Sequence, residues 1–214
     1  MSMYGEMFEY VDHYLTESGG QSATIISAKF PFRKRSEHIW RVYKWARRLT
    51  KEGSFTGDID RQALLTAALF HDIGYGVSPE SAKHAENSAK IFNKYCRDHE
   101  VENAEFVESL IRNHSRKDIL HDRDTPMELV LLMEADLLDE TGALSIVWDC
   151  MGEGASEDQS YEKTCRHIEN YSSKILDSNP MRTDTARRYW VQKQNLMREF
   201  MKQLKYDLDI DQTK

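Results

Sequence analysis

The stretch that decides the fold is Arg61-Gln-Ala-Leu-Leu-Thr-Ala-Ala-Leu-Phe-His-Asp-Ile-Gly74. Apolar residues occupy nearly every position of its first ten residues, so they fall on all sides of a helix rather than on one face. A helix that is apolar all round is buried, and we expect this one at the centre of the protein. The pair His71-Asp72 follows at once, and Gly74 and Gly76 end the helix.

The segments on either side repeat the apolar spacing of helices. We expect helices from about Ser36, which is a plausible N-cap, and over 82–99, 101–114, 126–140, 161–176 and 184–208. No segment alternates like a strand, and 10 glycines and 4 prolines are few for a β protein of 214 residues. We therefore predict an all-α helical bundle. It forms a single domain over 1–214, with a core at about 35–150 and flanking helices over 1–20 and 160–208.

Composition narrows the classes of function. The formal net charge is −7, from 29 basic and 36 acidic residues, so the chain lacks the broad basic face that duplex nucleic acid requires. Its three cysteines form no CxxC pair, which favours a reducing compartment. No stretch approaches the about 20 apolar residues of a membrane span, and the N-terminus does not resemble a signal peptide. We predict a cytoplasmic protein with no duplex nucleic acid and no membrane as partner; the amphipathic residues 3–15 leave a homodimer open.

Six side chains that can bind a metal lie on the inward faces of five predicted helices. They are His38, His71, Asp72, His84, His114 and Asp136. His114, for example, continues the stripe of Val107, Leu110 and Ile111. A buried carboxylate costs several kcal/mol unless it is paired or bound to a metal. Four imidazoles that converge with two carboxylates are costly to bury without a cation, so the six together predict a metal site.

Three further histidines, His13, His99 and His121, stand among polar residues near helix ends. We expect them to be solvated.

The order His38, His71-Asp72, Asp136 resembles the H…HD…D signature of the HD superfamily of metal-dependent phosphohydrolases. The likeness extends over roughly 35–206 to a bacterial group of predicted HD hydrolases. Its further segments are His84-Ala-Glu-Asn-Ser-Ala89, Ile111-Arg-Asn-His-Ser115 and Ala135-Asp-Leu-Leu-Asp-Glu-Thr-Gly-Ala143. The resemblance implies an HD-type helical fold.

The resemblance also implies roles for the six side chains. His38, His71, Asp72 and Asp136 would hold a first metal ion. His84 and His114 would hold a second ion with Asp72 as the bridge, or contact phosphate where one ion binds. Asp72 would be the catalytic residue. Two arginines of the group are replaced here by Leu137 and Trp148, and Glu134 stands for an aspartate, which points to a different substrate or a shifted activity.

The ligand types predict the chemistry. Imidazole and carboxylate suit one or two divalent ions of Mn, Fe, Co, Ni or Zn, and no thiolate selects a softer metal. Such an ion lowers the pKa of its water from about 16 towards about 7. Cations near the ligands in sequence are the candidates for holding a substrate phosphate, and they are Arg35, Lys83 and Arg116.

We therefore predict a phosphatase or phosphodiesterase that acts on a small phosphorylated molecule, a nucleotide or related metabolite. Two alternatives stay open. A mixed-valent di-iron oxygenase of the HD superfamily uses the same six ligands, and the replaced arginines make a non-catalytic ligand-binding module credible.

Overall fold

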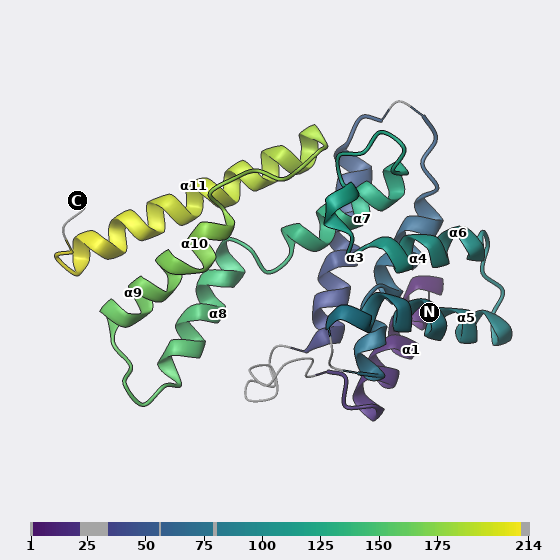
Figure 1. Ribbon diagram of the computed structural model, residues 1–214, viewed down its shortest axis with the longest axis horizontal. Coiled ribbons are helices and arrows are strands. Elements are labelled where there is room, and N and C mark those ends of the chain that lie inside the picture. Colours follow the sequence, from purple (N-terminus) through teal and green to yellow (C-terminus); the bar gives the residue numbers. More distant parts are fainter. Residues whose placement is uncertain (1, 22–33, 56, 79–80, 211–214) are drawn as a thin grey trace. The chain divides into compact units, whose positions relative to one another are not determined.

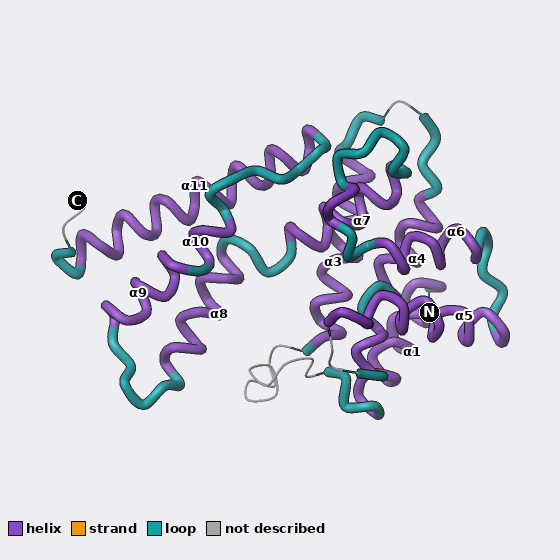
Figure 2. The backbone as a smooth tube through the Cα atoms, in the orientation of Figure 1, coloured by secondary structure: helices purple, strands orange, loops and turns teal. Residues whose placement is uncertain are grey.

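The computed structural model describes residues 2–21, 34–55, 57–78 and 81–210. Its regular elements in these residues are all helices, joined by loops, with no strand among them, which confirms the all-α prediction (Figure 2). The chain divides into two compact units, residues 1–136 and 137–214, which we call the N-terminal and C-terminal units. The prediction of a single domain stays a prediction.

The N-terminal unit consists of α1 (Met3–Glu17), α3 (Arg35–Glu52), α4 (Arg61–Phe70), α5 (His84–Asp98), α6 (Ala104–Asn113) and most of α7 (Met127–Leu138). Three short 3-10 turns connect them, namely η1 (Ile73–Gly76), η2 (Ser81–Lys83) and η3 (Lys117–Ile119). Figure 1 shows these helices gathered around α4.

The central position of α4 confirms what its sequence predicts. Every residue from 63 to 70 is buried, and α4 packs against α1, α3, α5 and α6. Its N-terminus is capped by Asp60, whose carboxylate accepts a hydrogen bond of 2.8 Å from the N–H of Ala63. The helix ends directly at His71, so the His-Asp pair is fixed at the tip of the best-buried element in the unit.

The start of α3 differs from the prediction. The helix begins at Arg35 after Lys34, so the expected N-cap Ser36 is wrong and lies buried inside the first turn. The reason is an acceptor from elsewhere in the chain: the side-chain oxygen of Gln21 accepts a hydrogen bond of 3.0 Å from the N–H of Ser36. The side chain of Gln21 therefore accepts a helix N-terminal N–H that a local capping residue would otherwise accept.

The C-terminal unit packs α8 (Ala143–Gly154), α9 (Tyr161–Asn170), α10 (Ser172–Ile175) and the long α11 (Asp184–Asp207) against one another (Figure 1). Trp190 of α11 is buried, and its indole N–H donates a hydrogen bond of 2.7 Å to the carbonyl of Ser178. Within the described ranges, no helix combines the length and the apolar character that crossing a membrane requires. The cytoplasmic location stays a prediction.

Candidate metal centre

The structure brings all six predicted side chains together within the N-terminal unit. They come from the five helices that the sequence predicts, and most stand at a helix end. His38 lies near the start of α3, and His84 is the first residue of α5. His71 and His114 directly follow α4 and α6, Asp72 follows His71, and Asp136 lies in the last turns of α7.

A first group of ligand atoms surrounds one point. The Nε2 atoms of His38 and His71 are 3.3 Å apart. The Oδ2 atom of Asp72 lies 3.5 Å from the first nitrogen and 3.7 Å from the second. The Oδ1 atom of Asp136 lies 3.4 and 3.9 Å from the same two nitrogens.

A second group uses the other oxygen of the same aspartate. The Oδ1 atom of Asp72 lies 3.4 Å from the Nε2 atom of His84 and 3.4 Å from that of His114. The two nitrogens are 3.0 Å apart. Asp72 therefore faces both groups, with one oxygen toward each.

These spacings fit a divalent ion. Two atoms bound to one ion at about 2.0–2.2 Å lie about 2.8–3.6 Å apart at angles between square and tetrahedral, close to the distances within each group. The ring orientations also fit. The Nδ1 atoms of His71 and His114 lie 2.9 and 2.7 Å from the carbonyls of Ala68 and Ile111. Since a carbonyl only accepts, each Nδ1 carries the proton, and each Nε2 directs a lone pair into the group.

Electrostatics favour the same protonation states. Burial lowers the pKa of His71 to about 3, so its imidazole is neutral in the neutral pH range. Burial by itself would raise the pKa of Asp72, but His71 and the Arg35 guanidinium hold it well below its usual value. For Asp136 burial is likewise outweighed, chiefly by the Lys117 ammonium, and the pKa is again lowered. The centre thus offers a neutral imidazole at His71 and ionised carboxylates at Asp72 and Asp136, the forms that bind divalent ions.

The three predicted phosphate-binding cations lie in different surroundings. The Nη1 atom of Arg35 is 2.8 Å from Asp72 Oδ2, and its side chain is 20% exposed, so it stands at the edge of the centre. Arg116 is exposed and pairs with Asp118 at 3.2 Å instead. Lys83 is exposed, one residue before His84. Arg35 thus contacts a residue of the centre directly, whereas Arg116 pairs with a surface carboxylate.

Two further residues lie at the centre beside the six side chains and Arg35. Lys117 lies in η3, and its Nζ atom is 2.8 Å from Asp136 Oδ2 and 2.9 Å from the carbonyl of His114. The signal for it was its place three residues after His114. Tyr75 lies in η1, with its ring beside both Arg35 and His84. Nothing in the sequence pattern marks Tyr75 except its position three residues after Asp72.

The histidines predicted to be solvated lie away from these groups. His13, His99 and His121 are exposed. The His99 ring stacks on Tyr95 with ring centroids 4.0 Å apart, so it also packs on a neighbour.

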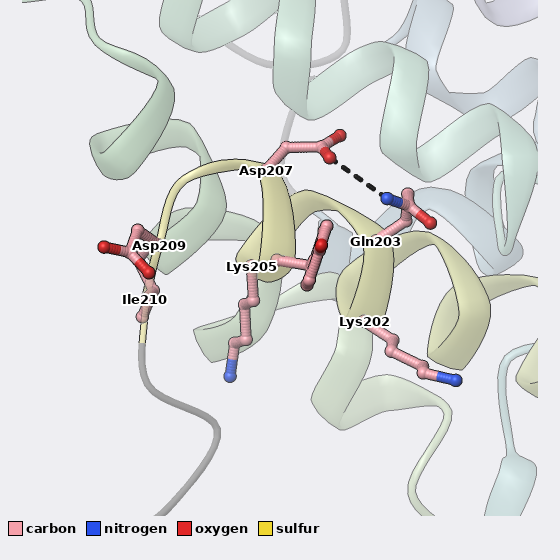
Figure 3. Close-up of a pocket in the computed structure, with 7 residues that line it drawn as sticks. Lys202, Gln203, Lys205, Asp207, Asp209 and Ile210 are labelled. Atoms are coloured by element: carbon pink, nitrogen blue, oxygen red, sulfur yellow. Dashed lines mark hydrogen bonds between the residues drawn. The ribbon is translucent and has the colours of Figure 1, made fainter.

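Leu137 and Trp148, which replace the expected arginines, belong to the C-terminal unit, and both are half-buried. That unit also carries a hollow at the end of α11 (Figure 3). Its lining is Lys202, Gln203, Lys205, Tyr206, Asp207, Asp209 and Ile210, which includes no histidine. The amide of Gln203 donates a hydrogen bond of 3.0 Å to Asp207, and Lys205 pairs with Glu169. This hollow lacks the metal-binding character of the centre.

Comparison with known proteins agrees with this geometry. Among solved structures, Bacillus subtilis YpgQ in complex with ADP is 23% identical, with a TM-score of 0.60 over 98% of this chain and 100% of that one. An HD-superfamily hydrolase from Bacillus thuringiensis is 21% identical, with a TM-score of 0.60 over 96% and 100%. The Lin1889 protein of Listeria innocua is 20% identical, with a TM-score of 0.58 over 99% and 100%. These likenesses establish the fold, and no curated protein matches the chain.

The sequence itself matches the HD domain over residues 35–141. This range is half of the chain, and it includes all six side chains of the centre and the His-Asp pair at the tip of the buried helix. The chain therefore belongs to the HD domain family.

Proposed function

We propose that the chain is a metal-dependent phosphohydrolase that acts on a small phosphoester, in the first place a nucleotide. The observation that carries the proposal is the carboxylate of Asp72, which faces a pair of imidazoles with each of its oxygens. Such an arrangement suits one or two divalent ions and needs no serine or cysteine nucleophile. Arg35 at the edge of the centre supports a phosphate as the ligand, because a guanidinium binds phosphate oxygens with a planar fork of donors.

The nucleotide is the substrate class favoured by similarity. One solved relative, Bacillus subtilis YpgQ, was determined in complex with ADP. ADP combines phosphate groups, which Arg35 would bind, with a phosphoester bond and a phosphoanhydride bond that an activated water can attack.

In the mechanism, His38, His71, Asp72 and Asp136 would hold a first ion, and His84 and His114 would hold a second with Asp72. A divalent ion held there would lower the pKa of a water towards about 7 and neutralise charge on a phosphoryl oxygen. The protein residues supply the rest. The carbonyls of Ala68 and Ile111 fix the rings of His71 and His114, so that the Nε2 atom of each is directed inward.

The two cations have separate tasks. Arg35 would bind and orient the substrate phosphate from the Asp72 side of the centre. Lys117 fixes the Asp136 carboxylate through a contact of 2.8 Å and keeps it ionised. Since Lys117 also donates to the carbonyl of His114, it ties both groups of ligands to the same turn.

The test is a panel of phosphoesters with defined metals. The protein is stripped with a chelator and loaded in turn with Mn, Fe, Co, Ni or Zn. Nucleoside mono-, di- and triphosphates and p-nitrophenyl phosphate are offered, and the products are separated by chromatography. We expect hydrolysis of at least one nucleotide with at least one metal, and none in the stripped protein.

Two other outcomes would overturn the proposal. Oxygen consumption by the iron-loaded protein without phosphoester hydrolysis would favour a di-iron oxygenase, for which the same six side chains are suitable. Tight nucleotide binding without turnover for every metal would favour a non-catalytic module, in line with Leu137 and Trp148 where arginines were expected. The homodimer stays a prediction, to be checked by light scattering.

A further inference from the structure

One aromatic ring contacts a residue on each side of the Asp72 carboxylate. The guanidinium carbon of Arg35 lies 4.3 Å from the centroid of the Tyr75 ring. The same ring is stacked on His84, with ring centroids 4.9 Å apart and an angle of 13° between the planes. Arg35 in turn contacts Asp72 Oδ2 at 2.8 Å, and His84 lies 3.4 Å from Asp72 Oδ1.

The backbone around Tyr75 is fixed against the helix that carries His84. The N–H of Tyr75 donates a hydrogen bond of 3.2 Å to the carbonyl of Asp72. The N–H of Gly74 donates one of 2.8 Å to the hydroxyl of Ser88 in α5. A Cβ atom at Gly74 would lie 2.1 Å from the carbonyl oxygen of His84 and 2.5 Å from the backbone nitrogen of Ser88, so only glycine allows this approach. The turn therefore holds the ring at a set place beside His84.

The two contacts differ in what they stabilise. The guanidinium of Arg35 is attracted to the face of the Tyr75 ring, and this attraction restricts the rotamers of the arginine side chain. The parallel imidazole is fixed in its orientation by the stacked ring. Tyr75 is half-buried, so its ring lies at the edge of the centre and is partly exposed to solvent. Loss of the ring would leave Arg35 and His84 free to take other rotamers.

We propose that Tyr75 is a positioning residue that holds Arg35 for the substrate phosphate and His84 for the second metal ion. The inference rests on the proposed function, since it assigns a phosphate to Arg35 and an ion to His84. It adds that one ring couples the two tasks, so that both weaken together when the ring is lost.

The ring carries this role, and the hydroxyl does not. Both contacts on which the role rests are made by the ring of Tyr75. Tyr75→Phe keeps the ring and is the conservative variant. Tyr75→Leu keeps much of the apolar bulk and removes both aromatic contacts. Tyr75→Met is a more flexible replacement that serves the same purpose if leucine impairs folding.

Metal binding is the first readout and is independent of turnover. Mn²⁺ is titrated calorimetrically into the stripped full-length protein without substrate. We expect two classes of sites in the wild type and in Tyr75→Phe. In Tyr75→Leu we expect the weaker class to lose about 2- to 10-fold in affinity, the range of an aromatic contact, while the stronger class is unchanged.

Steady-state kinetics and inhibition by inorganic phosphate are the second readout. Tyr75→Leu should raise KM and the inhibition constant of phosphate by about 3- to 30-fold, the range of a cation–aromatic contact, with a smaller change in kcat. In an Arg35→Gln background with saturating Mn²⁺, the same substitution should leave the inhibition constant unchanged, because Tyr75 then acts on phosphate only through Arg35.

The outcomes distinguish a failure of the proposed function from a failure of the positioning role. A wild type that binds no Mn²⁺ and hydrolyses no phosphoester refutes the proposed function, and the inference falls with it. A wild type that does both, with Tyr75→Leu unchanged in metal and phosphate affinity, refutes the positioning role alone. Equal weakening of both metal classes would indicate a general structural effect and would also refute it, as would a wild type with a single class of sites.

Discussion

Replacing Asp72 by asparagine removes one charge from the centre while keeping the shape of the side chain. In the structure the carboxylate is 6% exposed. Its Oδ2 atom faces His38 and His71, and its Oδ1 atom faces His84 and His114. Asp72→Asn is therefore expected to weaken both groups of ligands at once.

The size of the effect follows from these contacts. Loss of a group that only orients a metal ligand costs about 10- to 100-fold in metal affinity. Asp72 offers a direct ligand atom to each group, so we expect at least about a 100-fold loss, or about 3 kcal/mol of binding free energy. The loss of folding stability should be smaller. Breaking a buried ion pair costs about 3–5 kcal/mol, but Arg35 is 20% exposed and water replaces part of the contact, so we expect about 1 kcal/mol.

The assay combines metal analysis, turnover and unfolding. After loading and gel filtration, Asp72→Asn should hold well under one equivalent of metal and hydrolyse the best nucleotide at background rate, with a urea midpoint close to that of the wild type. His121→Ala, at an exposed position outside the centre, is the control and should match the wild type. Full metal content and full turnover in Asp72→Asn would refute the assignment of this site.

Three other predictions concern stability and stoichiometry. Because burial lowers the pKa of His71 from 6.5 to about 3, the unfolded chain takes up a proton below about pH 6.5 that the folded chain does not bind until about pH 3. Chelator-treated protein should thus lose about 2 kcal/mol of unfolding free energy between pH 7 and pH 5 in urea titrations, and a flat profile would contradict this. Gly74→Ala should cost about 3 kcal/mol because its Cβ would meet backbone atoms, whereas Gly152→Ala, with open space around it, should stabilise α8 by about 0.5–1 kcal/mol in thermal unfolding. His114→Gln should remove the weaker class of Mn²⁺ sites in calorimetry and retain the stronger one; loss of both would argue against two separate groups.

The parts of the fold that the sequence predicts well are those where local pattern and burial coincide. The stretch 61–70 is apolar on all sides, and its helix is buried over eight consecutive residues. The same logic applies to His114, which continues an apolar stripe and is buried with it, and to Asp136, which continues another and faces His38 and His71. Helical periodicity therefore predicts which polar groups meet, even though it gives no distances.

Long-range contacts lie beyond such patterns. Ser36 has the chemistry of an N-cap, but the side chain of Gln21, 15 residues earlier, takes over that task. Arg116 and Lys117 are neighbours with the same charge, yet Lys117 pairs with Asp136 of the centre whereas Arg116 pairs with Asp118. Tyr75 meets Arg35 across 40 positions of sequence. Each of these depends on how two elements pack, which a single-sequence pattern does not contain.

The same hydrogen bonds serve the helices and the centre. The last carbonyls of a helix lack N–H partners within it, and a donor placed after the helix end can satisfy one of them. His71 follows α4 and His114 follows α6, and the Nδ1–H of each donates to a carbonyl three residues earlier. That bond completes the helix end, and it also fixes the tautomer whose Nε2 lone pair is directed inward. A glutamine at either position would have to satisfy the carbonyl and offer a ligand atom with one flexible amide. The histidine performs both tasks with opposite sides of a rigid ring, which is a physical reason for histidines at the ends of two buried helices.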